Sequence, residues 1–544
     1  MAKFIFVTGG VVSSLGKGIA TASIGAILKS MGYRVSLKKL DPYLNIDPGT
    51  MNPSEHGEVF VTEDGAESDL DLGHYERFTQ ILTTKESNIT SGKIYQQLIQ
   101  NERQGKYLGK TVQTIPHVTD LISQFIINNP KKSDFIICEV GGTVGDIEAL
   151  PFFETIRQIR QKQKGKTMLI HLTYVPYLAT SKEIKTKPTQ HSVKELMSIG
   201  LSPDALLCRS SVNIGKENKK KIALFCNVEQ ESVFSGLDVK SIYEIPPLYV
   251  EQNMHKAIHK HFEMNMVEPP RLEHFSSYTN TLYNTKKKNN QLKIAIIGKY
   301  TNHSDAYKSI CESLEHACVS FNAYPEIIWI DSEEFTTQEP TYESLKGAQC
   351  VIIPGGFGVR GVEGKIKFIE FLRKQNIPTL GICLGMQLMV IEYARNILNI
   401  KDACSAEWHK ADEIHGTKIV DLMTSFIQDG KIEERSNSTD IGGTMRLGSH
   451  TTNIANKESL AYKIYKNHRI TERHRHRYEV DLSMKEQFER NGMMFSGISD
   501  ESLPEIIELP QNNFFVGVQF HPEFQSSFNK PSLIFTALIS YVLG

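Results

Sequence analysis

Short apolar runs alternate with helical patterns from the start of the chain onward. Phe4 to Val7 predicts a buried strand, followed by a Gly/Ser loop, a helix from about Ile19 to Met31, and a strand at Val35 to Lys39. A strand, a crossover helix and a second strand form a βαβ unit, which needs a parallel sheet with helices on both faces. The same pattern predicts strands at residues 135–140, 168–173 and 205–209, and a second series with strands at 292–297, 326–330 and 350–353 and a helix at 306–321.

Residues 266–291 separate the two series. They hold Pro269-Pro270 and a polar stretch that ends in Asn284-Thr285-Lys286-Lys287-Lys288-Asn289-Asn290, which predicts a linker with a solvated lysine run. We therefore expect an α/β chain of two doubly wound domains, residues 1–265 and 292–544. The polar residues 429–440 predict a surface loop.

Charge and cysteine usage exclude several classes of protein. Lys+Arg is 61 and Asp+Glu is 62, so the balance offers no support for a nucleic-acid partner. The eight cysteines include no Cys-x-x-Cys pair, which argues against structural zinc, and most lie in apolar runs as buried thiols. No run approaches the roughly 18 apolar residues of a membrane helix, and the first apolar run is too short for a signal peptide. We expect a cytoplasmic protein with reduced thiols and no membrane partner.

A glycine-rich loop, Gly9 to Gly18, lies between the first strand and the first helix. Its backbone N–H groups, the helix N-terminus and Lys17 are suited to hold phosphate. The loop departs from the G-x-x-x-x-G-K-[ST] pattern, because five residues separate Gly10 from Gly16 and Gly18 replaces the usual hydroxyl residue. Ser14 is then a candidate for the missing hydroxyl. Gly298-Lys299 also ends a strand but has no glycine loop before it, so we do not expect it to bind phosphate.

Carboxylates near this loop are candidates to hold Mg²⁺. Glu67, Asp69 and Asp71 alternate, which would place them on one side of an extended segment, although such a stripe is often only solvated. Glu139 ends an apolar strand and precedes two glycines, the position where ligands bind in doubly wound sheets. Lys38 and Lys39 end the second strand, and only one of them can point to a given face.

A second constellation lies in the C-terminal half. Gly381-Ile382-Cys383-Leu384-Gly385 reproduces a nucleophile elbow with a cysteine, and the helix that follows favours the thiolate. His521 and Glu523 follow a strand near the chain end and can share one face. A thiol, an imidazole and a carboxylate predict nucleophilic acyl transfer. Backbone N–H groups of residues 354–358 and of Leu384 are candidates for the oxyanion hole.

Basic residues alternate with histidines at Arg473-His474-Arg475-His476-Arg477. In a strand the arginines share one face and the histidines the other. A metal site is weakly supported, and we expect the arginines to hold an anion or the other domain.

An amidase site beside an ATP-phosphate site indicates a synthetase, in which released ammonia displaces a phosphate. The chain resembles the CTP synthase family from end to end, with a P-loop-like synthetase domain followed by a class I glutamine amidotransferase domain. The matching segments are residues 6–18, 39–43, 56–61, 69–78, 141–148, 185–192, 381–387, 442–448 and 521–523.

The resemblance implies roles for individual residues. It implies ATP binding by Ser14, Leu15, Gly16, Lys17, Gly18, Ile19, Asp71 and Val239, with Lys39 as a further phosphate contact and Asp71 and Glu139 as Mg²⁺ ligands. It implies binding of UTP, or of the inhibitor CTP, by Ser13, Asp146, Ile147, Glu148, Lys185, Thr186, Lys187, Pro188, Thr189, Gln190 and Lys221. It implies glutamine binding by Gly356, Leu384, Gly385, Met386, Gln387, Glu407 and Arg477.

The resemblance also implies regulation and assembly. GTP would be an allosteric activator near Arg360, Gly361 and Glu363, and residues 442–448 would form a mobile lid over the glutaminase site. The family implies a homotetramer, a dimer of dimers, and some members polymerise.

Two alternatives stay open at this stage. The N-terminal fold also resembles dethiobiotin synthetase, which would make the acceptor a carboxylate, although residues 142–148 and 185–190 argue against it. A filament-forming scaffold without catalysis is opposed by the intact Cys383, His521 and Glu523.

Overall fold

The computed structural model describes all residues except 1, 267, 409–415, 423–424, 429–430 and 435–444. The chain folds as two compact units. Unit 1 comprises residues 1–48 and 71–280, and unit 2 comprises residues 49–70 and 281–544. No helix in the described part of the chain is both long and apolar enough to cross a bilayer.

Unit 1 is built on a seven-stranded sheet in which every neighbouring pair is parallel. Its strands, in spatial order, are β11 (Val233–Leu237), β10 (Ala205–Ser210), β7 (Thr167–Tyr174), β1 (Lys3–Gly9), β6 (Phe135–Val140), β2 (Val35–Asp41) and β5 (Asn88–Thr90). The strands predicted at the start of the chain and at residues 135–140, 168–173 and 205–209 are all present.

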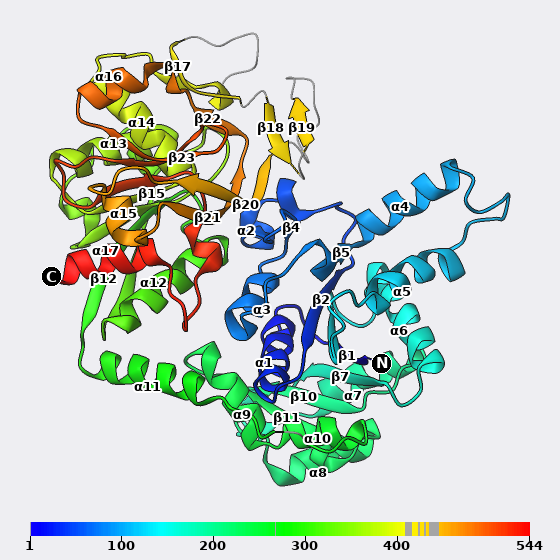
Figure 1. Cartoon of the computed structure of the whole chain (residues 1–544). Helices are drawn as coiled ribbons and strands as arrows, with labels where there is room; N and C mark the ends of the chain where they lie inside the picture. Colours follow the sequence, from blue (N-terminus) through cyan, green and yellow to red (C-terminus); the bar gives the residue numbers. More distant parts are fainter. Residues whose placement is uncertain (1, 267, 409–415, 423–424, 429–430, 435–444) are drawn as a thin grey trace. The chain divides into compact units, whose positions relative to one another are not determined.

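Helices cover both faces of this sheet. They are α1 (Lys17–Ser30), α3 (Asp71–Thr79), α4 (Ser91–Arg103), α5 (Thr119–Ile127), α6 (Leu150–Lys162), α7 (Lys187–Ser198), α8 (Gly215–Cys226), α9 (Ile245–Glu251) and α10 (Met254–His261), with a small hairpin of β8 (Tyr177–Leu178) and β9 (Glu183–Ile184). Phe4 and Phe6 of β1 pack with the apolar side chains of α5 and α6, so the alternate residues Ile5 and Val7 face α1. Figure 1 shows α1 on one side of the sheet and α5 and α6 on the other.

Unit 2 is built on a nine-stranded mixed sheet. In spatial order it holds β13 (Tyr324–Asp331), β12 (Gln291–Gly298), β14 (Cys350–Ile353), β15 (Thr379–Ile382), β25 (Phe515–Val518), β24 (Pro504–Glu508), β23 (Met494–Ser499), β20 (Arg446–Asn453) and β21 (Arg469–His476). The first five strands are parallel and the rest join as antiparallel strands. The fold class is thus α/β in both units, as predicted.

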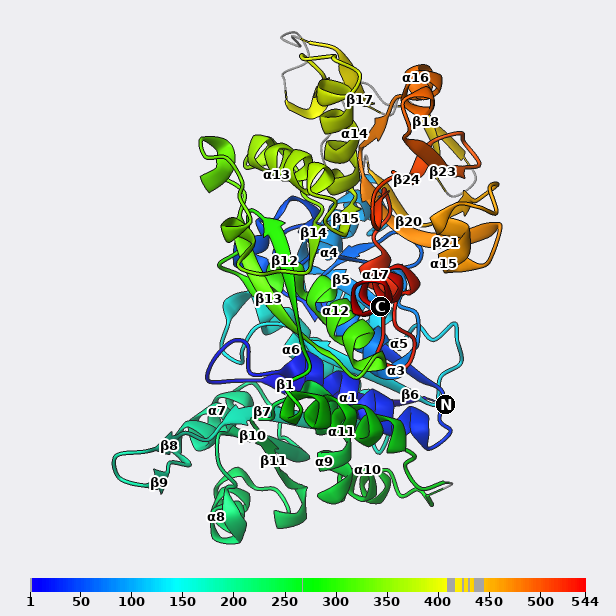
Figure 2. The same cartoon turned by 90° about the vertical axis from the view of Figure 1, so that its left-hand side faces the viewer.

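The helices of unit 2 also lie on two faces. α13 (Val362–Lys374) and α14 (Leu384–Asn396) pack in one apolar core, while α12 (Lys308–Ser320) and α17 (Leu533–Leu543) pack in the other (Figure 2). The remaining elements are α2 (Pro53–His56), α15 (Leu460–Tyr465), α16 (Lys485–Arg490), β3 (Phe60–Val61), β4 (Glu67–Ser68), β16 (Cys404–Ser405), β17 (Lys418–Leu422), β22 (Tyr478–Val480), β18 (Ser425–Gln428) and β19 (Lys431–Glu434).

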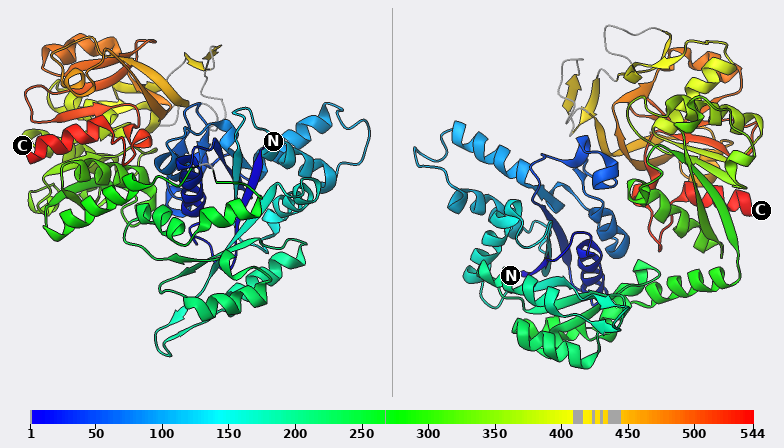
Figure 3. Two further views of the ribbon diagram at one scale, coloured as in Figure 1. Left: turned by 60° about the horizontal axis from the view of Figure 1, so that its bottom comes forward. Right: turned by 180° about the vertical axis from the view of Figure 1, so that it is seen from behind.

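Two predicted irregular regions contain regular structure. Residues 266–291 include α11 (Glu273–Lys287), a continuous helix visible in Figure 3, whose Phe275 and Leu282 are buried while its last lysines are exposed. Apolar residues at helical spacing stabilise it despite the polar average. Residues 429–440 include β19, so the prediction of a loop is wrong at Lys431–Glu434. The other residues of that segment lie outside the described residues.

Candidate functional site

The loop between β1 and α1 adopts unusual backbone conformations. Val11, Ser14 and Gly16 have φ of 78°, 55° and 93°. Ser13 and Ser14 are exposed, whereas Lys17 is buried at the start of α1 and its Nζ donates to the Gly142 carbonyl at 2.9 Å. Burial lowers the pKa of Lys17, and the charge of Glu139 works against that shift. The lysine therefore reaches the carboxyl ends of the parallel strands, where ligands of such sheets bind.

Gly18 occupies the position where a hydroxyl residue was expected, and the structure gives the reason. A Cβ atom at Gly18 would collide with the Asp71 carboxylate, which packs directly against the first turn of α1. A carboxylate next to a helix N-terminus is favoured by the helix dipole. Asp71 thus takes the space that a serine or threonine side chain would fill.

Lys39, Asp71 and Glu139 form a buried charged cluster. Lys39 Nζ donates to Glu139 Oε1 at 2.9 Å and also to Asp71, while the Tyr75 hydroxyl donates to Glu139. Burial and the charge of Asp71 raise the pKa of Glu139 to about 7. Burial opposes ionisation of Asp71, but Lys39 and His74 outweigh it and lower the pKa of that carboxyl.

The same cluster suits Mg²⁺. Carboxylate oxygens are the ligands this ion prefers, and the carboxylates of Asp71 and Glu139 lie close together because both contact Lys39 Nζ. In the described part of the chain no three His, Cys, Asp or Glu side chains gather as a metal site. Two carboxylates leave the remaining ligands to phosphate and water, the usual arrangement for Mg²⁺.

The predicted stripe of three acidic residues is wrong. Asp71 begins α3, so the segment is not extended throughout. Glu67 lies in β4 of unit 2, where Arg475 pairs with it at 2.8 Å, and Asp69 lies 3.6 Å from His56. A short alternation of acids carries no information about where a strand gives way to a helix. The expected division of the lysine pair is correct, because Lys38 donates to the Phe125 and Asn128 carbonyls instead.

Four residues implied in ATP binding line one cavity of unit 1. They are Leu15, Gly16, Ile19 and Val239, and the lining also includes Arg209 and Tyr249. Arg209 donates to the Leu15 carbonyl at 3.3 Å and pairs with Asp238 at 2.7 Å. Arg209 was missed from the sequence, since nothing in the pattern of β10 distinguishes it.

Most of the residues implied in UTP or CTP binding lie in two segments of unit 1, while Ser13 lies in the loop before α1 and Lys221 in α8. Asp146 accepts from the Thr143 N–H and hydroxyl at 2.5 and 2.9 Å, while Ile147 and Glu148 are exposed. The second segment flanks the start of α7. Lys185 pairs with Glu183, and Lys187 and Pro188 are the first residues of the helix. Gln190 bonds to Thr186 at 3.1 Å, and Thr189 bonds to Thr173 at 3.0 Å. Lys221 is exposed on the adjacent α8.

Cys383 sits in the sharp turn that the motif predicted. Its φ of 53° and ψ of −108° are strained for a non-glycine residue, and α14 begins at the next residue. The flanking glycines are required, because a Cβ at Gly381 would meet the Gly385 backbone and one at Gly385 would meet the Ile353 carbonyl. Leu384, Gly385, Met386 and Gln387 form the first turn of α14.

His521 and Glu523 complete the predicted triad. His521 Nδ1 bonds to Glu523 Oε1 at 2.7 Å. A Cβ added to Gly355 would lie 3.0 Å from His521 Cε1 and 3.4 Å from Cys383 Cβ, so the imidazole and the thiol face the same glycine. Burial works against protonation of His521, but the charges of Glu523 and Cys383 outweigh it and raise its pKa to about 10. The imidazolium is therefore present at neutral pH and lost as the pH rises through about 10.

Three charged side chains hold the glycine loop that faces this triad. Buried Lys365 donates to the Pro354 carbonyl at 3.0 Å, Lys299 donates to the Phe357 carbonyl, and Glu407 accepts from the Gly358 N–H at 2.7 Å. Burial lowers the pKa of Lys365 to about 7 and also lowers that of Lys299. Lys299 therefore helps to hold the glycine loop through the Phe357 carbonyl. Lys365 was missed from the sequence.

The other implied ligand residues lie around this loop. Gly356 belongs to it, and Arg477 acts electrostatically on Glu407 and lowers its pKa, against the larger effect of burial. Arg360 pairs with Glu333 at 3.1 Å and stacks on Tyr300, Gly361 precedes α13, and Glu363 pairs with Arg395 at 2.8 Å. Of the predicted lid, residues 442–444 lie outside the described residues.

The alternating arginines bind a segment from the first half of the sequence. Arg473 donates to the Val61 carbonyl at 3.0 Å and stacks on Phe60, while Arg475 holds Glu67 and the Gly49 carbonyl. In unit 2, α2 and β4 accordingly lie beside β20 and β21 (Figures 1 and 3). The expectation that these arginines hold an anion or the other domain is met by Glu67, which folds as part of unit 2.

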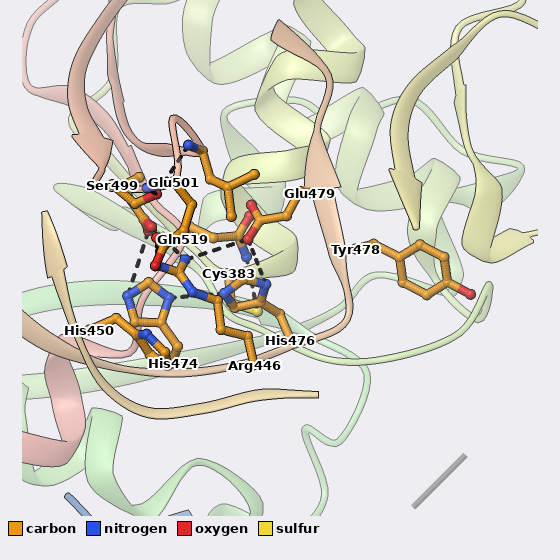
Figure 4. Close-up of polar contacts among 12 residues, drawn as sticks. Cys383, Arg446, His450, His474, His476, Tyr478, Glu479, Ser499, Glu501 and Gln519 are labelled. Atoms are coloured by element: carbon orange, nitrogen blue, oxygen red, sulfur yellow. Dashed lines mark hydrogen bonds and ion pairs between the residues drawn. The ribbon is translucent and has the colours of Figure 1, made fainter. Parts of the chain in front are cut away.

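The alternating histidines point into a buried polar cluster behind Cys383. His474 and His476 contact each other at 2.9 Å, and His476 lies 3.3 Å from Glu479. Figure 4 shows Cys383, Gln519, Glu479 and His476 gathered in one place. Burial lowers the pKa of both histidines, with the charge of Arg446 adding to it, so they are neutral; burial raises the pKa of Glu479.

Comparison with known proteins covers nearly the whole chain. The family described as "CTP synthase N-terminus" matches residues 3–264, and "Glutamine amidotransferase class-I" matches residues 302–541. A CTP synthase of Pelagibacter ubique is 51% identical over 541 residues, 99% of each chain, and one of Roseobacter denitrificans is 50% identical over 99% of this chain and 98% of its own. Among solved structures, the Trypanosoma brucei CTPS glutaminase domain with bound acivicin is 33% identical, with a TM-score of 0.40, over 46% of this chain and 94% of its own.

Proposed function

The chain belongs to the CTP synthase family, and on this premise we propose how its residues divide the reaction. Its activity is the ATP-dependent amination of UTP to CTP with glutamine as nitrogen donor, a ligase reaction that forms a C–N bond. The functional domains we propose are residues 1–265 for the synthetase, 266–291 for the linker and 292–544 for the amidotransferase.

Glutamine hydrolysis is assigned to Cys383, His521 and Glu523. The Cys383 sulfur attacks the side-chain amide carbon of glutamine, and the His521 imidazolium gives its proton to the leaving ammonia. Water then attacks the thioester with His521 as base, which releases glutamate and the thiol. Gly356, Leu384 to Gln387, Glu407 and Arg477 bind the substrate. The observation that carries this assignment is the strained Cys383 beside an imidazole bonded to Glu523 at 2.7 Å.

UTP activation is assigned to the charged cluster of unit 1. Lys17 and Lys39 hold phosphate oxygens while the γ-phosphoryl group of ATP passes to O4 of UTP. Ammonia attacks C4, the C–O bond breaks and phosphate leaves. Mg²⁺ neutralises phosphate charge when bound, and Asp71 and Glu139 are the residues that would hold it.

Nucleotide recognition is assigned to the residues that the family resemblance implies. ATP is bound by Leu15, Gly16, Ile19 and Val239, and Ser14 and Gly18 lie beside its phosphates. UTP or CTP is bound by Ser13, residues 146–148, residues 185–190 and Lys221. Regulation by GTP near Arg360, Gly361 and Glu363, a homotetramer built as a dimer of dimers, and a cytoplasmic location complete the proposal.

The test follows absorbance in the band where cytosine and uracil differ. Purified protein is mixed with UTP, ATP, Mg²⁺ and ammonium, and ammonium is then replaced by glutamine with and without GTP. We expect CTP from both nitrogen sources. Hydrolysis of glutamine without CTP from either source would reject UTP as the acceptor and leave the amidase assignment standing.

A further inference from the structure

Gln519 lies between the catalytic cysteine and a second glutamine in the core of unit 2. It follows β25 two residues before His521 and is fully buried. Its Nε2 lies 3.7 Å from Cys383 Sγ, and its Oε1 lies 3.1 Å from Gln387 Nε2. Figure 4 shows the Gln519 side chain beside the cysteine.

The orientation of this amide is fixed by its neighbours. Gln387 Nε2 also lies 2.8 Å from the Tyr478 backbone carbonyl, a group that only accepts hydrogen bonds. The NH₂ end of Gln387 must therefore face both Tyr478 and Gln519. It follows that Gln519 presents its oxygen to Gln387 and its NH₂ group to the Cys383 sulfur.

A donor in this position acts on the reacting atom. Hydrogen bonds to a charged acceptor are stronger than those to a neutral one, so the N–H group favours the thiolate over the thiol. Unlike a lysine, a carboxamide supplies this bond without titrating. The charged or titratable groups that act on the same sulfur include His521, Glu479 and Lys365, and the Arg475 backbone carbonyl lies 3.7 Å from it as an acceptor for the thiol proton. Burial raises the pKa of Glu479, so near neutral pH it adds no negative charge to oppose the thiolate.

We propose that Gln519 is a further catalytic residue of glutamine hydrolysis, which donates an amide N–H to the Cys383 sulfur and stabilises the thiolate that attacks the substrate. Gln387 and the Tyr478 carbonyl hold the amide in the required orientation. The proposal rests on the assignment of Cys383 as the nucleophile of the amidotransferase reaction.

The test replaces Gln519 by Met, which keeps the length of the side chain and removes the donor. The rate of Cys383 alkylation by iodoacetamide is measured from pH 5 to 9, with the modified peptide identified by mass spectrometry. We expect the midpoint of this profile to move upward by about one pH unit and kcat for glutamine-dependent synthesis to fall about tenfold. The KM for glutamine should stay within about twofold, because the donor faces the sulfur and not the substrate.

A second variant and a control separate the outcomes. Gln519→Glu places a carboxyl group against the sulfur and should move the midpoint further upward than Gln519→Met. Gln525→Leu, which changes an amide bonded to the Thr471 carbonyl and Glu472, should leave the profile unchanged. An unchanged melting curve reports that each variant is folded, and ammonia-dependent CTP synthesis reports that unit 1 is intact.

An unmoved midpoint in a Gln519→Met protein with an unchanged melting curve would overturn the proposal. A shifted midpoint with unchanged kcat would also overturn it, because the bond would then not serve the reaction. Failure of the wild-type protein to make CTP would count against the proposed function alone, since alkylation reads the thiolate without substrate.

Discussion

The two candidate sites satisfy their charged groups in different ways. In unit 2 the protein's own groups fix the reacting residues: Cys383 is held in a strained turn, His521 is bonded to Glu523, and the glycine loop is held at three points. In unit 1 the groups neutralise one another, with Lys39 bonded to both Asp71 and Glu139. A covalent reaction needs a nucleophile ready in place, whereas phosphoryl transfer brings its own charges with the nucleotide and the ion. The first site is therefore expected to fail through loss of single groups, and the second through imbalance of charge.

The largest expected effect is that of Cys383→Ala, which removes the proposed nucleophile of unit 2. We expect it to lower glutamine-dependent CTP synthesis by about 1,000-fold or more, because no other group replaces the nucleophile. Ammonia-dependent synthesis should stay within twofold of the wild type, since unit 1 retains its charged cluster. Both rates are measured on one preparation by absorbance. Loss of both in a protein with an unchanged melting curve would contradict the separation of the sites.

Glu139→Gln tests the charged cluster of unit 1. It keeps the shape of a buried side chain and removes half of the carboxylate pair that faces Lys39. We expect CTP synthesis with either nitrogen source to fall about 100-fold, with a raised Mg²⁺ requirement. The rate of Cys383 alkylation should not change. Glu154→Gln, at a partly buried carboxylate paired with Arg157, is the matched control, and an equal loss there would reject the assignment.

Lys365→Met sharpens the comparison within unit 2. Removing the buried cation frees the Pro354 carbonyl, and the loop that faces His521 and Cys383 loses one of its holds. We expect the kcat of glutamine-dependent synthesis to fall about tenfold, since small misplacements of oxyanion donors are costly. The ammonia-dependent rate is the internal reference. Lys367→Met changes a partly buried neighbour on α13 that pairs with Glu339 and should have no effect. Equal kcat values for the two variants would refute the role of Lys365.

The last prediction concerns stability and pH in unit 1. His171 bonds to Thr8 at 2.9 Å and Ser192 at 2.8 Å, and burial, aided by the charge of Lys17, lowers its pKa to about 3. Between that value and the unfolded value of 6.5 the unfolded chain binds the extra proton, so stability is lost as the pH falls from about 7. We expect about 2 kcal/mol of lost protection between pH 7 and pH 5, measured by hydrogen exchange of β1 and β7 peptides.

The control for this effect is the pair of variants His171→Gln and His191→Gln. The first removes the titrating group and should flatten the pH dependence, while the second changes an exposed histidine of α7 and should not. The same slope in all three proteins would show that another group carries it.

The strands and the sharp turn at Cys383 were predictable because their signals are local. An apolar run bounded by glycines specifies a strand of a parallel sheet, and Gly-x-Cys-x-Gly specifies a turn that only that spacing permits. Asp71 was predicted to lie in an extended segment, but it is the first residue of α3. The point at which an extended segment ends depends on how the following helix packs, which the local sequence does not show. Lys365 and Gln519 carry no local signal, since both residue types are usually exposed and only tertiary burial gives them a role. The nucleotide residues came from the family resemblance, because Lys185 and Lys187 alone indicate a solvated loop.

The placement of residues 49–70 in unit 2 has a consequence for folding during synthesis. They are synthesised together with the first strands of unit 1, but they fold with unit 2. There Glu67 pairs with Arg475, which is synthesised 408 positions later. At about 5–20 residues per second this wait lasts roughly 20 to 80 seconds. During that time Phe60 and Val61, buried in the finished protein, have no native neighbours from the later half of the chain. A ribosome that stalls between residues 70 and 475 would therefore hold this apolar segment before its partner in unit 2 has been made.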